Sequence, residues 1–144
     1  MIKLGMVVKL MTQSSYHDSW YIYDLENWII PAIENDRLVI LYSDHGPIGF
    51  YTYTFLTKDA EFGYLTKTKS LTPEDWTTEQ GDGTLYVIDF MALESVRNCV
   101  KLCRNHLHQL FGDKEDFGYF FRRAKGRLGK IAKKREELCW KMAS

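Results

Sequence analysis

The segment from Ser14 to Trp20, with the sequence SSYHDSW, contains the first side chains that could carry out chemistry. His17 follows Ser14 by three residues, and because an imidazole titrates close to neutral pH, His17 is a candidate general base. Asp18 and Ser19 are instead typical of a residue that caps the start of a helix. The segment alone leaves both interpretations open, since a placed base also needs an orienting carboxylate from another part of the chain.

Asp89 is the candidate for that carboxylate, because it interrupts the apolar strand pattern LYVIDFMA at residues 85–92. A carboxylate in a dry site is costly unless a hydrogen bond or an ion pair compensates for the lost water. Two interpretations remain open. Asp89 lies near the end of the strand and caps a neighbouring loop, or it pairs with an imidazole, whose tautomer it fixes and whose basicity it raises.

A second group of residues has the spacing of a metal site, because Cys99, Cys103 and His106 share one face of a predicted helix. Such a trio could bind zinc together with a distant fourth ligand. The two cysteines, however, fall within an apolar stripe, where cysteine packs as a small hydrophobic residue. We therefore assign them to the core and expect no metal site, and we assign Asp44 and His45 to a tight turn.

Composition limits the classes of function that the chain can have. Its 144 residues carry a formal net charge of zero and predict a single domain spanning residues 1–144. The sequence contains no P-loop and no dinucleotide-binding glycine motif, no apolar run long enough for a membrane span and no signal-peptide pattern. The odd number of cysteines does not suggest a disulfide framework, so we expect a cytoplasmic protein.

Charge is unevenly distributed along this neutral chain. The stretch from Arg122 to Arg135 contains many basic residues and no acid, and it includes Arg123 and Arg127. A basic segment of this kind favours an acidic partner surface, a phosphate group or nucleic acid, although a solvated helix face gives the same pattern.

Periodicity and turn signals predict the elements that must position these residues. Helices are expected at 2–11, from 20 towards 28, at 58–66 and at 95–111, and Pro31 is expected to interrupt the second helix or to begin its last turn. Strands are expected at 37–44, 48–56, 84–92 and 117–123, and the strand at 84–92 is expected to be central and buried on both faces.

Thr72 and Asp75 have capping-box spacing for one further turn. A final basic helix would use Leu128, Ile131, Leu138, Cys139 and Met142 as its inner face. Strands separated by helices around a mixed sheet indicate an α/β or α+β fold.

Five fragments occur in an order and at a spacing that resemble the toxin-activating lysine-acyltransferases, the enzymes that fatty-acylate RTX toxins with acyl-acyl carrier protein as donor. They are SSYHDSW, the segment from IIPAIEN to FYTYTFL, SLTPEDW, LYVIDF and GKIAKK, which together span most of the chain. The resemblance implies a GNAT-like fold with a mostly antiparallel central sheet flanked by helices, and it implies a homodimer.

The resemblance also assigns roles to residues. The serine, histidine and tryptophan of the family motif match Ser14, His17 and Trp20, and its catalytic aspartate matches Asp89. His17 would then act as general base, Asp89 would support it, and Ser14 would have an ancillary or positioning role. Because an acyl carrier protein is strongly acidic, Arg122, Arg123 and Arg127 are expected to dock this carrier.

Two alternatives stay open. GNAT enzymes usually bind the cofactor pyrophosphate with a glycine-rich loop, and ALESVRN at residues 92–98 contains no glycine. The donor is therefore acyl-acyl carrier protein or, as the alternative, acyl-CoA used on a substrate that is not a toxin. The second alternative is a binding module without chemistry that uses the basic C-terminal helix, although we do not expect nucleic acid as its partner.

Overall fold

The computed structural model describes residues 2–13, 24–112, 119–122, 127–130 and 141–142. The helices are α1 (Ile2–Thr12), the π-helix η2 (Leu25–Ile29), α3 (Ile30–Glu34), α4 (Lys58–Thr66), the 3₁₀-helix η3 (Pro73–Trp76) and α5 (Val96–Phe111). The strands are β1 (Leu38–Ser43), β2 (Gly46–Leu56), β3 (Thr84–Ala92), β4 (Tyr119–Arg122), β5 (Arg127–Lys130) and β6 (Lys141–Met142). None of the helices within these ranges is long and apolar enough to cross a membrane.

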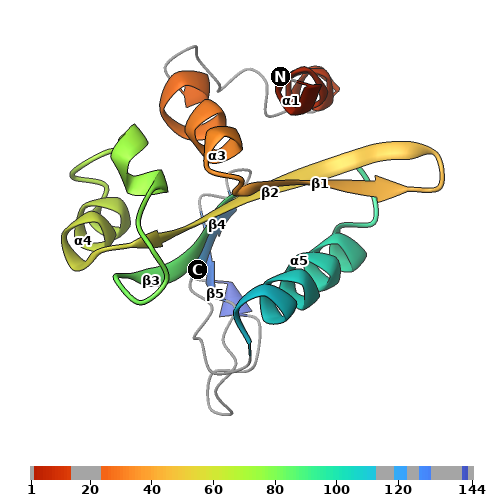
Figure 1. The fold of residues 1–144 in the computed structure, drawn as a ribbon. Helices are drawn as coiled ribbons and strands as arrows, with labels where there is room; N and C mark the ends of the chain where they lie inside the picture. The colour runs from red at the N-terminus through yellow and green to blue at the C-terminus, as the bar shows by residue number, and fades with distance from the viewer. Residues whose placement is uncertain (1, 14–23, 113–118, 123–126, 131–140, 143–144) are drawn as a thin grey trace.

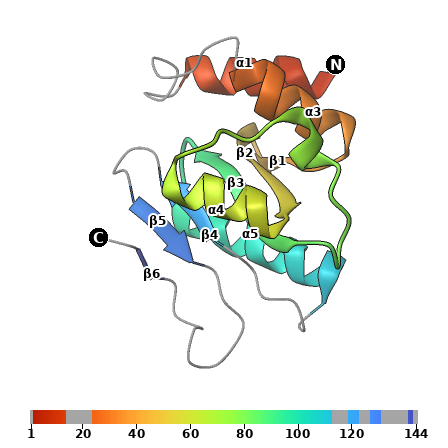
Figure 2. The ribbon, with the colours of Figure 1, turned by 90° about the vertical axis from the view of Figure 1, so that its left-hand side faces the viewer.

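The strands form two antiparallel sheets with the orders β1-β2-β3 and β4-β5-β6. Strand β3 is buried on both faces, as predicted, but the prediction that it is central is wrong, because β2 occupies the middle of the first sheet. The other edge of β3 lies beside β4 (Figure 2), and no hydrogen-bonded ladder joins these two strands within the described residues. The fold is α+β.

Helices cover both faces of the first sheet. Figure 1 shows α1 and α3 on one side of β1 and β2, and α5 on the other side. Alternation along β2 explains this arrangement, because Phe50 and Leu56 face the first layer, whereas Tyr51, Tyr53 and Phe55 face α5. Two separate hydrophobic clusters result, one on each face of the sheet.

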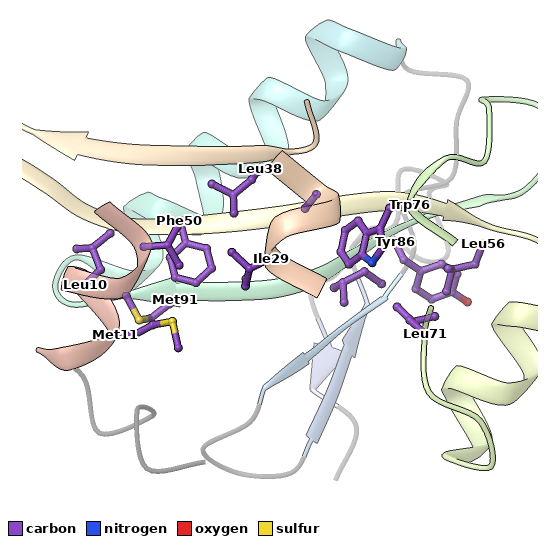
Figure 3. Packing of buried hydrophobic residues seen from close by; sticks show 13 residues of the cluster. Leu10, Met11, Ile29, Leu38, Phe50, Leu56, Leu71, Trp76, Tyr86 and Met91 are labelled. Atoms are coloured by element: carbon purple, nitrogen blue, oxygen red, sulfur yellow. The ribbon is translucent and has the colours of Figure 1, made fainter. Parts of the chain in front are cut away.

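The first cluster contains the inner side of α1, as the sequence pattern predicts. Val7, Leu10 and Met11 are buried, whereas Ile2, at the start of the same pattern, is 80% exposed. Figure 3 shows side chains from α1, η2, β2 and β3 gathered on this face, including Met11, Phe50 and Met91. We call this side of the sheet the α1 face.

Of the two predicted roles of Pro31, the second is confirmed, because Pro31 lies at the start of the last turn, α3, which continues to Glu34. Proline has no N–H to donate to the main-chain oxygen of Asn27, four residues earlier. That oxygen accepts a hydrogen bond of 2.9 Å from the indole Nε1 of Trp76, a side chain with no exposed surface. This hydrogen bond ties η3 to η2.

The elements with the strongest local signals agree with the prediction. The hairpin between β1 and β2 turns at Asp44 and His45, and α4 begins after Thr57, whose hydroxyl accepts a hydrogen bond from the Ala60 N–H. The capping box of Thr72 and Asp75 is present at the start of η3.

The C-terminal part differs from the prediction. Residues 127–130 form strand β5 and residues 141–142 form strand β6, so the prediction of one continuous basic helix through Leu128 and Met142 is wrong. Ile131, Leu138 and Cys139 lie outside the described residues. Gly129 lowers the helix propensity of this segment, and pairing with β4 supplies its backbone hydrogen bonds.

Candidate active site

Asp89 lies in β3 and is 4% exposed, and two hydrogen bonds join it to Thr52 of the neighbouring strand β2. The Asp89 main-chain N–H donates to Thr52 Oγ1 over 3.0 Å. The Thr52 hydroxyl donates to Asp89 Oδ2 over 3.1 Å. Thr52 itself has no exposed surface. The carboxylate is therefore held from across the sheet, and this contact differs from the loop cap that the sequence left open.

A β-bulge explains how this contact arises. Tyr51 pairs with Phe90 and Tyr53 pairs with Val87, so β3 contains one residue more than β2 across this interval. Thr52 therefore lies opposite two residues, Ile88 and Asp89. A bulge of this kind places two successive side chains on one side of the strand and bends it locally.

The bulge decides which face of the sheet receives the carboxylate. Before it, Ile88 belongs to the cluster on the α1 face and Val87 to the cluster against α5. Strict alternation would then direct Asp89 towards α5. After the bulge the order is shifted by one residue, since Met91 belongs to the α1 face and Phe90 packs on the α5 side. Asp89 contacts Thr52, so both polar side chains lie on the α1 face.

Ser14 and His17 lie outside the described residues, so the structure does not test their contact with Asp89. Their chain segment is nevertheless joined at both ends to elements of the α1 face. Met11, in the last turn of α1, is buried in that cluster, and Leu25, at the start of η2, packs against it. Both attachment points thus belong to the face that carries the carboxylate.

Two of the three arginines expected to dock a carrier lie on adjacent strands. Arg122 of β4 is directly opposite Arg127 of β5 in the antiparallel register. Arg123 lies outside the described residues. The ladder thus brings two of the three arginine positions into one pair.

Cys99 and Cys103 lie in the core against β2 and β3, which confirms their assignment as apolar packing residues. Cys99 has no exposed surface and Cys103 is 1% exposed. Burial raises the pKa of both thiols, whereas a zinc ligand is a thiolate. Within the described residues, no group of three or more His, Cys, Asp or Glu side chains could hold a metal ion.

His106 lies at the boundary of this core, where its Nδ1 is hydrogen-bonded to the hydroxyl of Tyr51. Tyr51 has no exposed surface, and burial raises the pKa of its hydroxyl. Burial also lowers the pKa of His106, because the charged imidazolium loses water there. The two side chains link α5 to β2 on the face opposite Asp89.

A cleft of about 460 Å³ lies along the outer edge of β1, between α1 and α5, and Asp89 does not line it. Arg37 O accepts from the Tyr53 N–H of β2, so by alternation the backbone groups of Leu38 point away from β2. Lys3 Nζ donates to Leu38 O over 3.0 Å and lies 3.8 Å from a carboxylate oxygen of Asp36. A lysine on a strand edge blocks pairing with another strand, and Lys3 has this position.

Thr52 is the one site residue that the sequence analysis did not identify. Its only signal is the alternation of threonine with large aromatic residues in FYTYTF, at residues 50–55. That pattern predicts two threonines on one face of a strand, but it does not indicate which side chain on another strand lies opposite them.

Comparison with known proteins gives a consistent set of relatives. Residues 2–133 match the model of the RTX toxin acyltransferase family. The RTX-II toxin-activating lysine-acyltransferase ApxIIC of Actinobacillus pleuropneumoniae is 36% identical over 89 residues, which are 62% of this chain and 54% of the relative. The leukotoxin-activating lysine-acyltransferase LktC serotype A1 of Mannheimia haemolytica is 35% identical over 89 residues, 62% of this chain and 52% of the relative. The protein-lysine myristoyltransferase RtxC of Kingella kingae is 32% identical over 111 residues, 77% of this chain and 63% of the relative. The chain spans about half the length of the first two relatives.

Proposed function

Because the chain belongs to the RTX toxin acyltransferase family, we propose that it is a protein lysine acyltransferase. The acyl group passes from the phosphopantetheine thioester of an acyl carrier protein to the ε-amine of a lysine in a protein substrate. Residues 1–144 act in this proposal as one GNAT-like domain, in the cytoplasm and as a homodimer.

The reaction requires a base. A lysine side chain has a pKa of about 10.4, so at neutral pH it is almost entirely protonated and cannot attack a thioester. An imidazole suits proton removal near neutral pH, and a fixed carboxylate raises its basicity and selects its tautomer. The proposal therefore needs a histidine and a held acid on one side of the fold.

The observation that most directly supports the proposal is the buried carboxylate of Asp89, which Thr52 holds on the α1 face. An ionisable group in such a position is a candidate for function, because burial has a cost that a purely structural residue would avoid. The segment that contains His17 is attached at both ends to elements of the same face. His17 is thus the base that we assign to Asp89.

The proposed reaction transfers the acyl group directly from the thioester sulfur to the lysine nitrogen. The lysine ammonium first loses one proton to solvent, and His17 then removes a proton from the neutral amine nitrogen as this nitrogen forms a bond to the thioester carbonyl carbon. A backbone N–H of β3 stabilises the negative oxygen of the tetrahedral intermediate. Asp89 supports the imidazolium, which returns its proton to the departing thiolate when the carbon–sulfur bond breaks. Ser14 has an ancillary role in orienting a reacting group, since direct transfer needs no seryl intermediate.

The arginines provide the docking site for the donor in this proposal. Arg122 and Arg127 occupy opposite positions of one ladder pair, with Arg123 next in sequence. A cluster of guanidinium groups favours both an acidic carrier protein and the phosphate of its pantetheine arm. Replacing the three arginines by glutamate should raise the KM for the carrier-linked donor, and an unchanged KM would remove the docking role.

The proposed function is tested by incubating the purified chain with candidate protein substrates and with C2 to C16 acyl donors. Each donor is offered on acyl carrier protein and on coenzyme A, and mass spectrometry locates acylated lysines. Transfer from the carrier-linked donor, abolished by His17→Ala, is the expected result. Transfer from coenzyme A alone favours the alternative donor, and transfer that survives His17→Ala excludes His17 as the base. Light scattering coupled to size-exclusion chromatography measures the molar mass of the purified chain and so tests the homodimer.

A further inference from the structure

We propose that Thr52 is a positioning residue for Asp89, which it holds in the orientation that supports the base. This inference rests on the proposed function, because it assumes that Asp89 acts on His17. Thr52 acts through Asp89 and contacts no reacting atom in the proposed scheme. Its assignment comes from the bulge between β2 and β3.

The two hydrogen bonds use the Thr52 hydroxyl in opposite directions. A hydroxyl has one proton to donate and two lone pairs to accept with. The proton is directed to Asp89 Oδ2 over 3.1 Å, and a lone pair accepts the Asp89 main-chain N–H over 3.0 Å. An ionised carboxylate only accepts hydrogen bonds, so the direction of the hydroxyl proton suits the charged form of Asp89. Holding both the main chain and the carboxylate of one residue restricts its rotation.

The bulge makes this arrangement specific to position 52. The inserted residue in a β-bulge is displaced from the regular ladder, and here its N–H bonds to a side chain of the opposite strand. Threonine is β-branched and therefore stiff about its first side-chain torsion, and Thr52 has no exposed surface. The same hydroxyl thus stabilises the bulge and orients the acid that the bulge turns to the α1 face.

A purely structural role for Thr52 is the alternative, and the chain contains a matched control for it. Thr54 lies two residues further along β2 and also has no exposed surface. Its hydroxyl donates to the main-chain oxygen of Asp75 over 2.8 Å and takes no part in the proposed mechanism. Thr54→Val therefore repeats the loss of a buried hydroxyl in the same strand while leaving Asp89 untouched.

The experiment compares Thr52→Val, Thr52→Ser and Thr54→Val by steady-state kinetics, with thermal unfolding to correct for the folded fraction. If Thr52 positions Asp89, Thr52→Val lowers kcat about 10- to 100-fold with KM unchanged. The acid limb of its pH–rate profile moves to lower pH, because the imidazolium loses support. Thr52→Ser keeps the hydroxyl and restores most of kcat, and Thr54→Val reduces thermal stability alone.

A double-mutant cycle with Asp89→Asn supplies the decisive comparison. If Thr52 acts only through Asp89, Thr52→Val has little further effect on kcat in the Asp89→Asn background. The inference is overturned if Thr52→Val lowers kcat as much in the Asp89→Asn background as it does in the original chain. It is also overturned if folded Thr52→Val protein keeps the kcat and the pH profile of the original chain. A chain in which His17→Ala and Asp89→Asn leave transfer unchanged instead refutes the proposed function, and the role of Thr52 is then refuted with it.

Discussion

Replacing Asp89 by asparagine separates the charge of this side chain from its shape. The amide oxygen can accept the Thr52 hydroxyl proton as Oδ2 does, and the main-chain N–H still reaches Thr52 Oγ1. A hydrogen bond to a neutral acceptor contributes about 1 kcal/mol less than one to a charged acceptor, and removal of a buried charge offsets part of this loss. We expect the free energy of unfolding to change by no more than about 1 kcal/mol, which corresponds to about 4 °C in Tm.

Activity should respond far more strongly than stability. Where an acid orients a catalytic histidine, its conversion to the amide lowers kcat by about 10⁴-fold, since the imidazole takes the wrong tautomer. A loss of about 10³- to 10⁴-fold in kcat corresponds to about 4–5.5 kcal/mol of activation free energy. Initial rates of lysine acylation, measured by intact-protein mass spectrometry, are compared with urea and thermal unfolding of the same preparation.

Asp44→Asn is the matched control, because Asp44 lies exposed in the hairpin turn and the substitution makes the same change in charge. This variant should keep both its activity and its stability. The reasoning is refuted if folded Asp89→Asn protein keeps kcat within about tenfold of the original chain. It is also refuted if the substitution unfolds the protein, because Asp89 would then be a structural residue.

Three further predictions concern the framework around the site. Trp76→Phe removes the indole donor to the Asn27 main-chain oxygen and shortens a fully buried side chain, so urea unfolding should show a loss of about 2–3 kcal/mol; a loss below about 0.5 kcal/mol would show that this contact is unimportant. Gly49→Ala directs a Cβ into the main chain of β3 and should lower the free energy of unfolding by about 1–3 kcal/mol in the same urea experiment. An unchanged free energy of unfolding would mean that β2 and β3 can move apart enough to accept the methyl group without loss of stability. Burial lowers the pKa of His106, which contacts Tyr51, so the unfolded chain binds a proton at pH values where the folded chain does not. The contribution of His106 to stability is therefore complete above about pH 6.5 and is lost as the pH falls through the folded-state pKa. His106→Gln should flatten the fall of Tm with acidification, and parallel Tm curves would contradict this account.

Local signals in the sequence predicted the elements whose hydrogen bonds are also local. Helix α4 covers the predicted range 58–66, η3 follows the Thr72–Asp75 box, and the hairpin turns where Asp44 and His45 interrupt two strand patterns. Each of these signals depends on residues within about four positions of each other, so the sequence contains nearly all of the relevant physics.

Predictions that depend on distant partners were less successful. Apolar spacing around Leu128 fits a helix, but residues 127–130 pair with β4 instead. The apolar character of residues 84–92 predicts a central strand, whereas β3 ends the first sheet and is buried by clusters on both of its faces. Neither outcome can be predicted from one segment alone, because strand pairing depends on the side chains and backbone of the partner strand.

The sequence by itself determined which segments favour helices or strands, and that one acid, Asp89, interrupts an apolar strand. These properties follow from the periodicity and the burial cost of the individual residues. Only the tertiary structure decided that a threonine 37 residues away holds this acid, and that a one-residue bulge turns it to the α1 face. The physical reason is that a shift of one residue in strand register reverses the face on which a side chain lies, and register depends on the packing of both strands together.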